Sequence, residues 1–154
     1  RVTDDRPAYP AASPWAGVAL FGFLLNFVWE LLQVPFYSGM ERAPHWEATL
    51  FCLRATIGDV AIVVVAYGAV AVRFGASWLA EPTVERLATF VGFGLLATGV
   101  IELLSVHLWG RWSYAAGVPT VLGVGLPPVL QWVLLPPVIL WLTRRHYGLF
   151  GEPQ

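Results

Sequence analysis

Three acidic residues, Glu30, Asp59 and Glu102, stand inside long apolar stretches of the chain. An acidic side chain at the centre of a membrane span costs about 2.5 to 3.5 kcal/mol, so residues of this kind are kept where they have a partner or a function. Carboxyl groups in different surroundings can divide the roles of proton donor and proton acceptor between them. The three acids are therefore the candidate catalytic residues. The chemistry they predict is proton transfer to a lipophilic substrate, as in an isomerase, hydratase or cyclase.

Polar and aromatic side chains recur at helical spacing around these acids. Four of them between positions 26 and 33 fall at i, i+3, i+4 and i+7, which places them on one face of a helix. Cys52 and Thr56 precede Asp59 at similar spacing, and Thr98 and Ser105 flank Glu102. The candidate ligand-binding residues are Asn26, Trp29, Gln33, Arg111, Trp112, Tyr114, Gln131 and Trp132.

The composition indicates a membrane protein. Hydrophobic residues make up 57% of the 154-residue chain and charged residues 12%, about half the charged fraction of a typical soluble domain. Nine basic residues against ten acidic ones leave no cationic field for phosphates, so a nucleic-acid partner is excluded. A disordered chain is excluded by the same apolar composition.

Four stretches are long enough to cross a bilayer as helices, at about 15–34, 49–72, 84–109 and 126–142. They lack the alternation of a membrane barrel, so the predicted fold is an all-α, four-helix transmembrane bundle. Residues 1–154 form a single transmembrane domain in this interpretation. Ala88, Gly92 and Gly99 fall on one stripe of the third span, where small side chains favour close approach of another helix. They are equally typical of ordinary membrane helices.

An even number of spans places both termini on one side of the membrane. Six arginines fall on that side: Arg1, Arg6, Arg73, Arg86, Arg144 and Arg145. The opposite side has Arg42, Arg111 and, near a span end, Arg54. This bias favours cytoplasmic termini and a plasma (inner) membrane location.

The buried acids converge at similar depth. Counted from the predicted non-cytoplasmic surface at 1.5 Å per residue, Glu30 lies about 6 Å deep, Gln131 about 8 Å, Glu102 about 10 Å and Asp59 about 14 Å. One polar chamber in that half of the membrane is the simplest arrangement. The carboxyl groups there must be protonated, paired with Arg54 or Arg111, or hydrogen-bonded to amide side chains.

The connections 35–48 and 110–125 are rich in glycine, proline and aromatic residues, and we expect them to cover this chamber. Arg111, Trp112 and Tyr114 beside Trp109 would suit an amphiphile with a polar or anionic head. The alternative is an aromatic belt at the membrane surface with one snorkelling arginine.

No cofactor or metal is predicted. The chain has no lysine for a Schiff base, and its single cysteine, Cys52, makes no CxxC motif. His45 and His107 fall on the same side of the membrane, so a metal or haem site between them stays open, although no HxxxH or HExxH spacing is present.

Two functions from different classes follow. The first is a membrane protein for an isoprenoid, quinone, sterol-like molecule or lipid, acting either as a binding protein or as an enzyme that transforms this ligand. In span count and buried acids the chain resembles small four-helix, sterol-isomerase-like membrane domains, and the resemblance assigns no residue a role. The second is a non-catalytic accessory subunit of a photosynthetic or respiratory complex, with homo-oligomers also possible. An ion carrier is disfavoured because the cytoplasmic halves of the spans offer no polar path.

Overall fold

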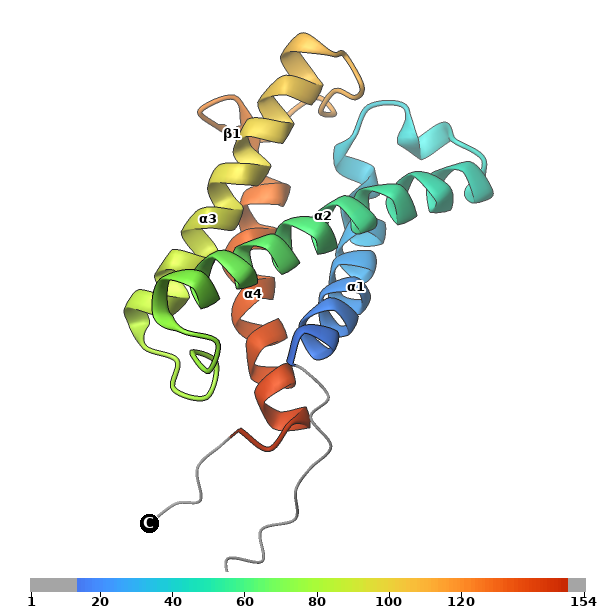
Figure 1. Cartoon of the computed structure of the whole chain (residues 1–154). Coiled ribbons are helices and arrows are strands. Elements are labelled where there is room, and N and C mark those ends of the chain that lie inside the picture. Colours follow the sequence, from blue (N-terminus) through green and yellow to red (C-terminus); the bar gives the residue numbers. More distant parts are fainter. Residues whose placement is uncertain (1–13, 150–154) are drawn as a thin grey trace, which may run out of the picture.

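The computed structural model describes residues 14–149 and has four long helices (Figure 1). The elements are α1 (Pro14–Gln33), two 3-10 turns (Val34–Phe36 and Met40–Arg42), α2 (His45–Phe74), α3 (Val84–Leu103), a π-helical turn (Leu104–Leu108), β1 (Thr120–Val121), β2 (Val124–Gly125) and α4 (Leu126–His146). All four α-helices are long and apolar enough to cross a membrane. This confirms the predicted all-α architecture with four membrane spans, so the chain is an integral membrane protein.

Local sequence signals set the helix ends. The Thr83 side chain accepts a hydrogen bond from the Arg86 backbone N–H at 3.3 Å and so caps α3. Pro127 and Pro128 occupy the first turn of α4, where the missing N–H groups have no helical partner to lose. These ends are the ones predicted from the residue types.

The helices pack in a ring, with α1 against α2 and α4, and α3 against the same two helices. The start of α1 and the end of α4 lie at the same end of the bundle (Figure 1). Helix α2 has 30 residues and is about 45 Å long at 1.5 Å per residue, which exceeds the thickness of the hydrocarbon core. It accordingly runs obliquely across its neighbours (Figure 1).

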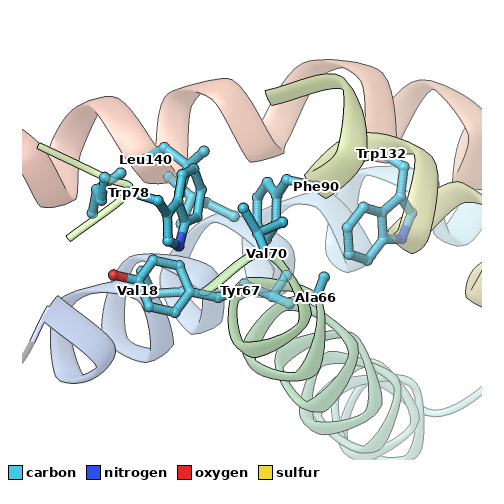
Figure 2. Close-up of a cluster of buried hydrophobic side chains, with 11 residues drawn as sticks. Val18, Ala66, Tyr67, Val70, Trp78, Phe90, Trp132 and Leu140 are labelled. Atoms are coloured by element: carbon cyan, nitrogen blue, oxygen red, sulfur yellow. The ribbon is translucent and has the colours of Figure 1, made fainter. Parts of the chain in front are cut away.

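The two ends of the bundle differ in polarity. The end that holds the start of α1 has an apolar core. In it, Val18, Tyr67, Trp78 and Phe90 are almost fully buried (Figure 2). Tyr67 and Trp78 pack with ring centroids 5.1 Å apart. Toward the other end, the buried side chains of the bundle are mostly amides, hydroxyls and carboxyls. The apolar core at one end of the bundle therefore adjoins a polar half at the other.

The close approach between α3 and α4 occurs at Gly94. A Cβ atom there would overlap the six-membered ring of Trp132, whereas a Cβ on Gly92 or Gly99 would meet nothing within 4 Å. The predicted small-residue stripe through Gly92 and Gly99 is thus wrong as a helix contact. The indole of Trp132 lies against the α3 backbone and belongs to the apolar core (Figure 2).

The two connections at the polar end pair with each other. Tyr37 and Tyr114 form an antiparallel bridge, and the Ser38 N–H donates to the Ser113 carbonyl at 2.9 Å. The Ser38 hydroxyl donates to the Tyr114 carbonyl at 2.8 Å. Residues far apart in the sequence are thereby joined into one cover over the end of the bundle.

Candidate functional site

The polar face of α1 faces the bundle interior. Asn26, Glu30 and Gln33 are each at most 5% exposed. The Gln33 amide donates to Glu30 Oε1 at 2.5 Å and accepts from the Trp29 indole N–H at 3.1 Å. The helical spacing of these residues therefore produces a connected row of hydrogen bonds along one helix.

Gln131 of α4 connects three helices. Its amide nitrogen donates to Asn26 Oδ1 at 2.7 Å and to Asp59 Oδ2 at 3.0 Å. Asn26 in turn donates to the Gly22 carbonyl at 2.7 Å. A single buried amide thus positions a carboxyl group of α2 against α1 and α4.

Glu30 and Asp59 form a carboxyl pair. The two side chains, from α1 and α2, line the same cavity, where Gln33 donates to Glu30 and Gln131 to Asp59. Two carboxyl groups can share a hydrogen bond only when one of them carries the proton. A hydrogen bond between Glu30 and Asp59 would therefore hold a proton inside the membrane.

Glu102 of α3 has different surroundings. Its Oε2 accepts hydrogen bonds from the Trp112 indole N–H, at 3.3 Å, and from the Tyr114 hydroxyl. Two donors converging on one oxygen favour a carboxylate acting as an acceptor. The bundle thus holds two acids on α1 and α2 and, on a third helix, an acid that accepts hydrogen bonds from two aromatic side chains.

These groups surround a cavity of about 530 Å³ within the bundle, in the size range of small-molecule sites. It is lined by Glu30, Gln33, Tyr37, Phe51, Arg54, Ala55, Gly58, Asp59, Ile62, Thr98, Ile101, Glu102, Arg111, Trp112, Pro128 and Gln131. Gly58 of α2 and Ile101 of α3 line it and are also exposed on the bundle surface. Lining residues of both α2 and α3 are thus accessible from the lateral surface of the bundle, at a level within the membrane spans.

Tyr37 is a lining residue that the sequence did not single out. It is 6% exposed, and its ring centroid lies 5.6 Å from that of Tyr114. Burial and the nearby Glu102 and Glu30 carboxyls raise the pKa of the Tyr37 phenol, and burial together with the Glu102 hydrogen bond raises that of Tyr114. Both hydroxyls thus remain proton donors. Only the residue type and its place in a connection predicted as a cover could have indicated Tyr37.

Two arginines line the same cavity, Arg54 from α2 and Arg111 from the second connection. Within residues 14–149, neither forms an ion pair with a carboxylate. The Arg111 guanidinium instead lies 4.5 Å from the ring centroid of Trp109. Arginines and amide side chains were both predicted as partners of the buried acids. In the structure, the acids accept hydrogen bonds from amide and aromatic side chains.

The eleven predicted site residues have three different placements. Seven of them line the cavity: Glu30, Gln33, Asp59, Glu102, Arg111, Trp112 and Gln131. Asn26, Trp29 and Tyr114 support lining residues through hydrogen bonds. Trp132 is not among the lining residues; it packs against Gly94 in the apolar core, and its indole N–H finds no partner in the part of the chain described.

The histidines considered for a metal site lie apart from this cavity's lining. His107 Nε2 is 3.3 Å from the Gly123 carbonyl oxygen. Among the described residues, no three histidine, cysteine, aspartate or glutamate side chains gather as ligands for a metal ion.

No family model, no curated protein and no solved structure matches this chain. A functional assignment therefore depends on the cavity and its side chains.

Proposed function

We propose that this membrane protein binds a lipophilic small molecule in the bundle cavity and transforms it by proton transfer. The observation that carries the proposal is the convergence of Glu30, Asp59 and Glu102, from three helices, on one cavity of about 530 Å³. Three acids inside membrane spans are costly, and an intramembrane ionisable group that faces a cavity is by default a functional candidate.

The lining favours a molecule that dissolves in the membrane. Phe51, Ile62, Ile101 and Pro128 provide apolar walls. In this proposal the ligand enters from the lipid through an opening beside the exposed Gly58. A polar group on the ligand would reach the carboxyls and Gln131. Isoprenoids, quinones, sterol-like molecules and lipids have this combination of a largely apolar body and few polar atoms.

The two kinds of carboxyl environment support isomerisation in particular. The Glu30 and Asp59 pair would donate its proton to one carbon of a double bond, and Glu102 would accept a proton from a neighbouring carbon. The double bond shifts and the overall proton count is unchanged. The aromatic face of Trp112 would stabilise the positive charge between the two steps. In this proposal the cavity lies in the non-cytoplasmic leaflet of the plasma membrane.

Mass spectrometry of the molecules that co-purify with the full chain in a neutral detergent tests the binding proposal. We expect one lipophilic species with the wild type and at least about a tenfold lower amount with Asp59→Asn or Glu102→Gln, the loss of about one charged-group hydrogen bond. Glu85→Gln is the matched control, because Glu85 is exposed in the first turn of α3, far along the helix from Glu102.

Incubation of the loaded protein in heavy water tests the chemistry. Proton transfer predicts deuterium in carbon-bound positions of the recovered molecule, and loss of that label in Glu30→Gln. A bound molecule without deuterium would leave a binding protein only. A chain that retains no molecule and unfolds without partner helices would contradict the proposal and favour an accessory subunit of a larger complex.

A further inference from the structure

Two guanidinium groups stand at one end of the cavity. Arg54 precedes Asp59 on α2 and so lies nearer the covered end of the bundle, and Arg111 belongs to the cover itself. Both side chains are exposed and both line the cavity. The cavity lining therefore contains two guanidinium groups as well as the three acids.

Arg54 is the tenth residue of α2, inside a membrane span. A guanidinium in a span requires an acceptor, because its charge is costly in hydrocarbon. The cavity carboxyls do not supply one: Gln33, Gln131, Trp112 and Tyr114 donate to them instead. Within the described residues, Arg54 and Arg111 have no carboxylate partner, so an anion from outside the chain would supply the acceptor.

We propose that the ligand of this cavity is an amphiphile with an anionic head, a phosphate or carboxylate, held by Arg54 and Arg111. Guanidinium groups match both anions with paired hydrogen bonds. Beside the arginines, the rings of Phe51 and Trp112 pack with centroids 6.1 Å apart, and Ile62 and Ile101 would provide apolar surface for the chain of the amphiphile. This inference rests on the proposed function of the cavity as a ligand site.

The anion bound by the two arginines could come from either of two sources. A molecule bound inside the cavity would supply the anion, and so would the phosphate of a bulk phospholipid lying at the bundle surface. The two differ in one respect, since only the first must pass the opening beside Gly58. A Cβ on Gly58 would meet nothing within 4 Å, so Gly58→Phe places a ring at this opening without a clash at its base.

Binding of four amphiphiles with the same chain tests the proposal: dodecyl phosphate, dodecanoate, dodecanol and dodecyltrimethylammonium. Affinities are measured for the full chain in phospholipid-free maltoside micelles. We expect the two anions to bind at least about tenfold tighter than dodecanol, as one charge-assisted contact predicts. Arg54→Gln and Arg111→Gln should remove this preference, and Arg111→Lys should keep part of it. Arg73→Gln, at the far end of α2 beside Phe74, should leave it unchanged.

The remaining outcomes contradict either the anionic head or the proposed ligand-binding function of the cavity. Equal binding of dodecanol and the anions, sensitive to Glu102→Gln, would leave the cavity as a site and refute the anionic head. If dodecyltrimethylammonium binds most tightly, the anionic head is likewise refuted and the cavity is kept as a ligand site. Anion binding that needs the arginines but survives Gly58→Phe would assign them to bulk phospholipid. Binding of none of the four would contradict the proposed function itself.

Discussion

Replacing Gly94 by alanine tests the packing of Trp132 beside the cavity. The new methyl group would overlap Cζ3, Cε3 and Cη2 of an indole that is 2% exposed, whereas carbon atoms in contact prefer about 3.5 to 4.0 Å. Overpacking of this kind costs about 1 to 3 kcal/mol, and the rigid ring favours the upper end. Alanine returns about 0.5 to 1 kcal/mol through its helix propensity. The expected net loss is about 2 kcal/mol in the free energy of unfolding.

Gly92→Ala is the matched control, because it lies in the same helix and its Cβ would meet nothing within 4 Å. We expect this variant to gain about 0.5 to 1 kcal/mol. Unfolding in mixed micelles with increasing dodecyl sulfate, followed by circular dichroism, measures both. Equal stability of the two variants would refute the placement of Trp132 against α3. In a Trp132→Leu background, Gly94→Ala should cost less than it does in the wild type, because the overlapping ring is gone.

Three further predictions concern the cavity. Gln131→Leu should destabilise the bundle by about 1 kcal/mol, at about 0.6 kcal/mol for each interhelical hydrogen bond lost; Gln33→Leu, whose side-chain bonds stay within α1, should cost less in the same unfolding assay. Gly58→Phe should leave that stability unchanged and reduce the co-purified lipophile about tenfold, and an undiminished lipophile would show that the opening lies elsewhere. Because the pKa values of Tyr37 and Tyr114 are raised, both phenols should stay neutral as the pH rises through about 10, the ordinary tyrosine value. The tyrosinate absorbance of Tyr37→Phe in that range should match the wild type, and a lower absorbance would contradict the burial of Tyr37.

The membrane fold was predictable because its signals are local. Apolar length, the Thr83 cap and the prolines at the start of α4 each act within a few residues. Periodicity also placed Glu30 and Gln33 on one buried face. The contacts between elements were not predictable in this way. Adjacent residues of a helix point about 100° apart, so Gln131 and Trp132 cannot both face the same cavity, and only packing decides which one does.

The cover of the cavity was also not predictable from local sequence signals. The bridge between Tyr37 and Tyr114 joins two connections that are remote in sequence. The π-helical turn at Leu104–Leu108 follows directly after Glu102 and has no sequence signal of its own. Both features lie between or beside the residues that bring Tyr114 to Glu102, and the bridge is a contact between remote segments.

Photolabelling with a long-chain alkanol that carries a diazirine tests most directly whether the cavity is the ligand site. Peptide mass spectrometry should place the label on the two strips that face the cavity, around Phe51 to Ile62 of α2 and Thr98 to Glu102 of α3, and excess unlabelled alkanol should remove it. Label spread over lipid-facing residues such as Val72 and Leu96, unaffected by the competitor, would contradict a binding cavity in this bundle.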